Sequence, residues 1–185
     1  MPPLTISTIK EILKEENLEK FPNFIETGTF HGTTVNRMIN HFKELHTIEL
    51  SEVLHKQCLQ KYSSDKIKFH LGDSSVVLPK ILPNIVGKSI FFLDGHYSSC
   101  STEQGDKDVP LYEELDAIMK FHKEECIIII DDARLFGTKR NEDWSYINSK
   151  QILSISSSRS SREFYLPSKS DPHDRLIIHL KPLEH

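Results

Sequence analysis

Two adjacent carboxylates end the most apolar run of the chain. Four isoleucines, 127–130, lead directly into Asp131 and Asp132, and a second apolar run, SIFFL, leads into Asp94. Carboxylates that gather in one place repel each other unless protons or a cation neutralise them, and hard oxygen ligands suit Mg²⁺ or Mn²⁺. If the two runs are neighbouring strands, we expect Asp94, Asp131 and Asp132 to form a divalent metal site.

A glycine-containing loop follows an earlier apolar run. The segment ETGTFHG places Gly28 and Gly32 between NFIET and an expected helix, where the backbone can approach a ligand and helix N–H groups can face it. The segment does not match GxGxxG, so a pyrophosphate clamp is disfavoured. Glu49 follows Gly28 by 21 residues, the place of a ribose-binding acid in a nucleotide-binding βαβ unit.

Asp73 and Ser74 end a third run, KIKFHL, and add polar groups at the same predicted edge. Ligands of open α/β sheets bind outside the carboxyl ends of the strands, so these groups should converge on one cleft. Each has a purely structural alternative. Asp73 could be a helix N-cap, Thr33 or Thr34 could be a simple cap of the helix that follows Gly32, and Glu26 could be a solvated strand end.

Short apolar runs alternate with helical patterns along the chain, which is typical of a parallel sheet. The last two runs are close together and favour an antiparallel hairpin. We therefore predict a Rossmann-like, doubly wound α/β sheet of about seven strands, mostly parallel, with a C-terminal antiparallel hairpin and helices on both faces. The expected strands are 23–27, 45–50, 66–71, 89–94, 126–131, 163–166 and 174–181, and the main expected helices are 33–42, 52–61, 111–122 and 144–153.

Composition limits the possible classes of protein. With 185 residues, 37% of them hydrophobic and 27% charged, the chain suits a single domain, which we place at 1–182 because residues 183–185 resemble an expression-tag remnant. A net charge of −4 gives no reason to expect a nucleic-acid partner. No apolar run approaches the roughly 20 residues of a membrane span, so we expect a cytoplasmic protein. The oligomeric state is not predicted.

Taken together, ETGTFHG, the acid of IEL, LGDS, FFLDGH and IIDDAR resemble the class I S-adenosylmethionine-dependent methyltransferases. The resemblance covers most of the chain and implies S-adenosylmethionine as cofactor. It implies that Glu26, Gly28 and Gly32 surround the methionine part, that Glu49 binds the ribose, and that Asp73 with Ser74 contacts the adenine. The full implied set of cofactor-binding residues is Glu26, Thr27, Gly28, Thr29, Gly32, Thr33, Glu49, Asp73, Ser74 and Asp94.

Within this class, the DGHYS and DDAR segments are similar to those of metal-dependent sugar O-methyltransferases, including glycan-modifying enzymes of bacteria and large algal viruses. The resemblance implies that Asp94, Asp131 and Asp132 hold Mg²⁺ or Mn²⁺. It also implies transfer of a methyl group to a sugar hydroxyl of a glycan or glycoside, such as a terminal rhamnose. A metal that binds two vicinal hydroxyls would acidify and orient one of them.

Asp94 is also a candidate catalytic residue, and we expect a base and an acceptor-binding loop beside it. His96 is the candidate base because an unperturbed imidazole is partly neutral at physiological pH, and His31 is a second candidate. The polar loop that follows Asp94 has the composition of a mobile lid. In this loop Tyr97 could stack on a sugar. Arg134, after the fifth strand, could bind an acceptor phosphate or hydroxyl or the cofactor carboxylate, or simply form a salt bridge to one of the clustered acids.

Two other functions fit the same residues. A methyltransferase for a catechol-like or other small diol would use the same metal chemistry with an aromatic acceptor. A nucleotide-binding domain without catalytic activity would keep the fold and the glycine loop alone.

Overall fold

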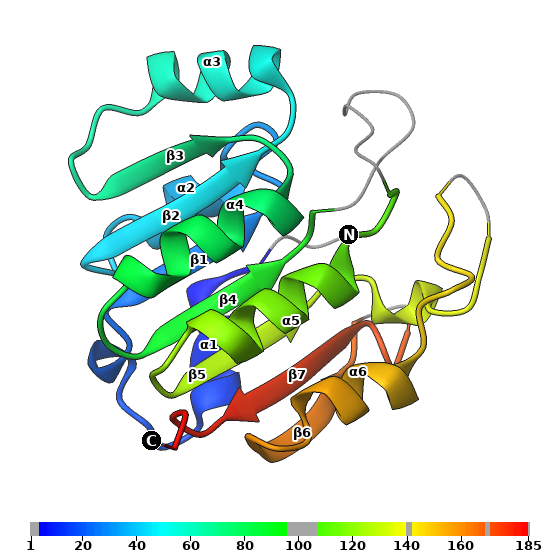
Figure 1. Cartoon of the computed structure of the whole chain (residues 1–185). Helices are drawn as coiled ribbons and strands as arrows, with labels where there is room; N and C mark the ends of the chain where they lie inside the picture. The colour runs from blue at the N-terminus through cyan, green and yellow to red at the C-terminus, as the bar shows by residue number, and fades with distance from the viewer. Residues whose placement is uncertain (1–3, 96–106, 140–141, 169–170, 185) are drawn as a thin grey trace.

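The computed structural model describes residues 4–95, 107–139, 142–168 and 171–184. Within them a single seven-stranded sheet has the order β3-β2-β1-β4-β5-β7-β6 (Figure 1). The first five strands are parallel, and β7 is antiparallel to both β5 and β6. The predicted fold class is therefore confirmed. The strands are β1 (Asn23–Thr27), β2 (Glu44–Glu49), β3 (Ile67–Leu71), β4 (Ser89–Leu93), β5 (Cys126–Ile130), β6 (Ser160–Leu166) and β7 (Arg175–Leu180).

Helices cover both faces of the sheet, which explains the run of four isoleucines. Figure 1 shows α4, α5 and α6 on one face and α1 on the other. Ile128 and Ile130 belong to the core under α4, α5 and α6, whereas Ile127 and Ile129 belong to the opposite core. A central strand that is buried on both faces has no polar side, so its sequence is apolar throughout. The helices are α1 (Ile6–Leu13), α2 (Thr33–Met38), α3 (Glu52–Lys61), α4 (Ser74–Ile81), α5 (Leu111–Phe121) and α6 (Ser149–Ser156).

The register of the parallel strands aligns their last residues. Thr27 of β1 is paired with Leu93 of β4, and Leu93 is paired with Ile130 of β5. Asp94 N–H then donates to the Thr27 carbonyl (3.3 Å), and Asp131 N–H donates to the Leu93 carbonyl (3.1 Å). The two acids that end the apolar runs are thus brought side by side, as predicted.

Four elements differ from the prediction. The helix after Gly32 ends at Met38 instead of residue 42. The last helix begins at Ser149 instead of residue 144, because Trp144 is held in a loop by bonds of its N–H to the Thr138 carbonyl and of its carbonyl to the Gly137 N–H (both 3.0 Å). The serine-rich segment before residue 163 contributes to α6 and to the start of β6, and α1 is an element that the sequence patterns do not predict.

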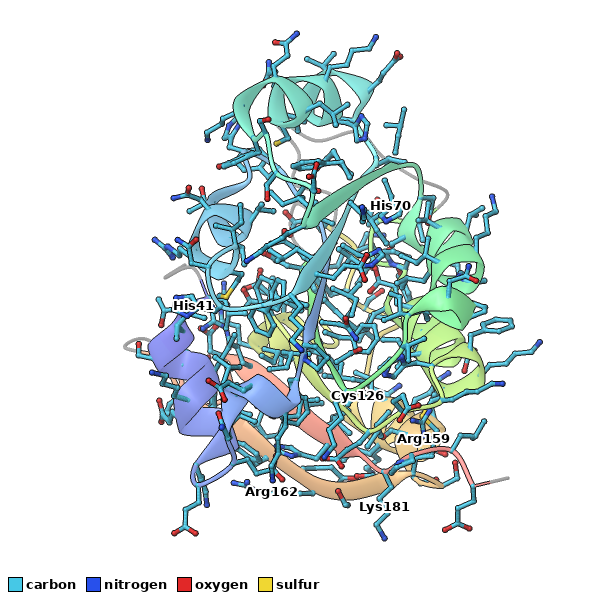
Figure 2. The ribbon with its side chains drawn as sticks, turned by 90° about the vertical axis from the view of Figure 1, so that its left-hand side faces the viewer. His41, His70, Cys126, Arg159, Arg162 and Lys181 are labelled. Carbon is cyan, nitrogen blue, oxygen red and sulfur yellow. The ribbon has the colours of Figure 1, made fainter. Side chains whose placement is uncertain are left out.

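The edge of the sheet opposite the candidate site is closed by one buried arginine. Arg159 is 4% exposed, and its guanidinium donates to the carbonyls of Lys181 (2.9 Å), His122 (2.8 Å) and Glu124 (2.9 Å). Figure 2 shows Arg159 near Cys126 and Lys181 at this end of the molecule. Arg159 thereby joins the end of α5 to the strand that follows, and its role is structural.

Among the described residues, no helix combines the length and the apolar character needed to cross a bilayer.

Candidate functional site

The glycine loop after β1 lies directly against the end of β4. Gly28 has a φ of +83°, and its N–H donates to the Ile48 carbonyl (2.9 Å). A Cβ at this position would lie 2.5 Å from the backbone oxygen of Asp94. Glycine is therefore required at residue 28 both for its left-handed backbone and for the close approach of two strand ends.

Glu26 is buried at the end of β1. It is 2% exposed, so the alternative of a solvated strand end is wrong. The Thr47 hydroxyl donates to Glu26 Oε2 (2.9 Å), and the hydroxyls of Thr47 and Thr29 are hydrogen-bonded to each other (2.6 Å). Burial penalises the charged carboxylate and raises the pKa of Glu26 to about 8. At neutral pH this residue is mostly a neutral acid that joins β1, β2 and the glycine loop.

Glu49, at the end of β2, shapes the same loop. Its Oε2 accepts the N–H of Phe30 (2.7 Å), and its Oε1 accepts the N–H of Ser51 (2.9 Å). Phe30 has a φ of +49°, an uncommon conformation for a residue with a side chain, and the bond to Glu49 helps to hold it. A carboxylate oxygen that accepts one hydrogen bond keeps further acceptor capacity, so both oxygens can still accept from a ligand.

Gly32 begins α2, and no threonine caps this helix. Gly32 is the N-cap, with a φ of +70° and no side-chain capping bond, and Thr33 is the first helical residue. The Tyr62 hydroxyl donates to the Gly32 carbonyl (2.8 Å), and a Cβ on Gly32 would lie 2.5 Å from the Tyr62 ring. The alternative role of Thr33 or Thr34 as a helix cap is therefore wrong.

Asp73 caps α4, which confirms the structural alternative proposed for it. Its Oδ1 accepts the backbone N–H of Ser75 (2.8 Å) and the Ser75 hydroxyl (2.6 Å). Ser74, the first residue of α4, is 8% exposed. Neither observation tests the predicted contact of these residues with adenine.

The three acids predicted as metal ligands end two adjacent strands and differ in environment. Burial, followed by the charges of Asp131 and Asp132, raises the pKa of Asp94 well above its ordinary value. Asp131 Oδ1 accepts a hydrogen bond from Arg175 Nε (2.8 Å), in an ion pair whose two side chains are 5% and 8% exposed. Arg175 therefore supplies a positive charge inside the acidic cluster.

A second arginine neutralises the other member of the pair. Arg134 forms ion pairs with Asp132 and with Asp174, which immediately precedes β7. Asp132 itself has a φ of +56° and begins a short 3-10 turn that contains Arg134. The salt-bridge alternative for Arg134 is confirmed, whereas its contact with an acceptor is not tested.

The chemistry of the three acids fits a divalent cation in part. Their oxygen donors are of the preferred type, and a cation would relieve the repulsion that Asp131 and Asp132 exert on Asp94. In the described part of the chain, however, no group of three or more His, Cys, Asp or Glu side chains is arranged to hold a metal ion. Two of the acids are instead paired with arginine.

Two predicted residues, His96 and Tyr97, lie outside the described residues. His31, the second candidate base, is exposed in the glycine loop, and its ring contacts that of Phe30 (3.9 Å between centroids).

Three important residues escape the sequence reasoning. Arg175 and Asp174 begin the last strand, and because β7 is antiparallel to β5, its start lies beside the end of β5. An Asp-Arg pair before a terminal antiparallel strand was thus a usable signal. Glu114 is the third: Leu111 and Ile118 lie three and four residues away on the buried side of α5, where a carboxyl is unexpected.

Comparison with known proteins adds information at the level of the fold alone. No protein-family model matches the sequence, and no curated protein matches it. The O-methyltransferase TomG of Streptomyces achromogenes, involved in tomaymycin synthesis and solved with S-adenosylmethionine, is similar with a TM-score of 0.65 and 14% identity, over 97% of this chain and 82% of TomG.

Two further solved structures share the fold with different acceptors. An rRNA methylase from Streptococcus thermophilus is similar with a TM-score of 0.58 and 13% identity, over 100% of this chain and 99% of that one. The N-methyltransferase NodS of Bradyrhizobium japonicum WM9 has a TM-score of 0.57 and 12% identity, with 96% of each chain covered. The chain therefore has the fold of the class I S-adenosylmethionine-dependent methyltransferases, a fold that serves acceptors of several kinds.

Proposed function

We propose that the protein is an S-adenosylmethionine-dependent O-methyltransferase that methylates a sugar hydroxyl of a glycan or glycoside, such as a rhamnose. The observation that carries this proposal is the convergence of Gly28, Glu49 and Asp94 at the carboxyl edge of a methyltransferase-type sheet. Open α/β sheets bind their ligands at this edge. The sugar acceptor is supported by the resemblance of the DGHYS and DDAR segments.

The residues of the site would divide the work of binding and proton transfer. When bound, S-adenosylmethionine supplies an electrophilic methyl group on its sulfonium. Gly28 would allow the backbone to approach the methionine part, and the Glu49 carboxylate, which already accepts two backbone N–H bonds, would accept hydrogen bonds from the ribose hydroxyls. Asp94 would help to bind the donor, and His96 would accept the proton that the acceptor hydroxyl loses. Gly28, Glu49 and Asp94 would thus bind the donor, and His96 would act as the base.

Asp94, Asp131 and Asp132 would hold a divalent cation if one takes part. The cation would supply Lewis acidity toward the acceptor hydroxyls. Substitution of Asp132 by Ala should then abolish Mg²⁺-stimulated turnover and leave the affinity for S-adenosylmethionine nearly intact. Full activity in excess chelator would refute the metal role, and the ion pairs with Arg175 and Arg134 would then account for the neutralisation of Asp131 and Asp132.

Calorimetry with S-adenosylmethionine and S-adenosylhomocysteine tests the first level of the proposal. If neither compound binds, the methyltransferase function is refuted, and a domain without catalytic activity is the remaining alternative. A mass-spectrometric screen with methyl glycosides, a catechol and an RNA oligonucleotide, each with and without Mg²⁺, tests the second level. Methylation of the catechol or the RNA without methylation of any sugar would overturn the acceptor class.

A further inference from the structure

Glu114 is a buried carboxyl for which the proposed reaction has no direct use. It lies on α5, is 2% exposed, and its Oε1 has no hydrogen-bond partner among the described residues. Burial raises the pKa of Glu114 to about 7. A poorly partnered buried carboxyl lowers stability, and a neutral apolar residue would fill the same volume without that cost. Such a group is expected where function requires it.

The carboxyl of Glu114 lies where three loops of the candidate site meet. The hydroxyls of Ser74, at the start of α4, and Thr27, at the end of β1, are close enough to this carboxyl to lower its pKa, which partly offsets the effect of burial. Thr27 Oγ1 in turn accepts the N–H of Gly95, which follows β4 (3.1 Å). A Cβ on Gly95 would lie 3.2 Å from Glu114 Oε1, so the carboxyl also contacts this backbone directly.

A small cavity extends the same junction toward the acids. Its volume is about 10 Å³, close to the minimum that holds one water molecule. Glu114, Asp94 and Asp131 line it together with Trp144. The Glu114 carboxyl therefore reaches from the adenine side of the proposed site, at Ser74, to the side of the strand ends at Asp94.

We propose that Glu114 is a positioning residue that fixes the loops after β1, β3 and β4 in the arrangement that binds the methyl donor. The Gly95 N–H donates to the Thr27 hydroxyl, and the Thr27 hydroxyl and the Glu114 carboxyl lie beside the same Gly95 backbone. The Ser74 hydroxyl reaches the same carboxyl from the opposite side. Glu114 acts through these three residues and does not itself contact the donor. This inference rests on the proposed function, because it assigns to Glu114 the geometry of that binding site.

Two substitutions separate positioning from packing. Glu114→Met fills the volume but accepts no comparable hydrogen bond, whereas Glu114→Gln keeps an acceptor oxygen and removes the charge. Both variants should unfold at a temperature equal to or above that of the natural protein, because both remove a buried carboxyl. Loss of the polar contacts of the carboxyl with Thr27 and Ser74 should weaken the binding of S-adenosylmethionine to Glu114→Met about tenfold. Glu114→Gln should bind nearly as tightly as the natural protein.

The measurements are calorimetric titrations with S-adenosylmethionine and S-adenosylhomocysteine, combined with thermal unfolding. Asp116→Asn, an exposed acid on the same helix, is the control and should change neither quantity. Natural affinity in Glu114→Met, or equal losses in the Met and Gln variants, would overturn the inference while leaving the methyltransferase proposal intact. Absence of binding by the natural protein would overturn both.

A second variant keeps the test decisive if Glu114→Met does not fold. Thr27→Val removes the hydroxyl that accepts the Gly95 N–H and preserves the shape of the side chain. It should weaken binding of S-adenosylmethionine as Glu114→Met would, and an unchanged affinity would overturn the inference.

Discussion

Replacing Gly28 by Ala should lower the stability of the protein by more than the cost of the left-handed backbone conformation alone. Gly28 combines a φ of +83° with a Cβ position only 2.5 Å from the Asp94 backbone oxygen and 3.0 Å from the Asp94 carbonyl carbon. The left-handed conformation costs a residue with a side chain about 1–2 kcal/mol. The added Cβ would clash with the backbone of Asp94, which cannot easily move because β4 is paired with β1. Overpacking of this kind adds about 1–3 kcal/mol to the loss of stability. We therefore expect a loss of about 2–5 kcal/mol.

Gly137 provides a matched control for the backbone term. It has a φ of +76°, yet a Cβ there would meet nothing within 4 Å. Gly137→Ala should therefore show only the conformational cost, about 1–2 kcal/mol, reduced slightly by the lower entropy of the unfolded chain. The difference between the two variants isolates the contact of Gly28 with Asp94.

Thermal unfolding and calorimetric titration with S-adenosylmethionine measure the two consequences. For a chain of this size, 1 kcal/mol corresponds to about 2–4 °C, so Gly28→Ala should unfold at least several degrees below Gly137→Ala. Gly28→Ala should also bind the cofactor much more weakly, because Asp94 is displaced, whereas Gly137→Ala should bind normally. Equal unfolding temperatures for the two variants would refute the close approach of the two strand ends.

Three further substitutions test the acids of the site. Glu49→Ala removes the carboxylate that holds the glycine loop and that is proposed to bind the ribose. The Kd for S-adenosylmethionine should therefore rise by about tenfold or more. An unchanged Kd in calorimetry would exclude the ribose role. Arg175→Met leaves the buried Asp131 carboxylate without its arginine and should lower the free energy of unfolding, measured with denaturant, by about 3–5 kcal/mol. Changing Asp131 to Asn as well should restore part of this stability. A loss below about 1 kcal/mol would contradict a buried ion pair. The raised pKa of Glu26, about 8 against an ordinary 4.5, means that its contribution to stability is complete below about pH 4.5 and is lost as the pH rises through 8. Glu26→Gln should therefore flatten the fall in unfolding temperature over this interval, and an unaltered pH profile would show that Glu26 is not the titrating group.

The central part of the fold was predictable because its signals are local. The strands β1, β2, β4 and β5 are short apolar runs separated by helical patterns, and the parallel sheet follows from that alternation. The errors lie at the periphery. Strand β6 is an edge strand with alternating exposure, SSREFYL, so its serines resemble a loop. Trp144 resembles a helical core residue because it is apolar, although its backbone bonds belong to a loop.

The site was predictable where it depends on strand ends and not where it depends on distant partners. Asp94 and Asp131 end adjacent runs, so sequence alone brings them together. The charges that neutralise the acids depend on the register of β7, which places Arg175 beside Asp131 across 44 residues. The sequence therefore indicates an excess of negative charge at the strand ends, and either a metal ion or a buried arginine could neutralise it.

Both proposed cations of the site, the sulfonium of the donor and a divalent metal, would be attracted by the same acids. The pKa of Asp94 is raised by burial and then by Asp131, Asp132 and Glu26, which shows that the edge has more negative charge than Arg175 offsets. S-adenosylhomocysteine lacks the sulfonium charge but keeps the rest of the donor. If the acids act on the sulfonium, S-adenosylmethionine should bind more tightly than S-adenosylhomocysteine in excess chelator, and Asp94→Asn should reduce that preference. If they act on a metal, the preference should be small without Mg²⁺ and insensitive to Asp94→Asn.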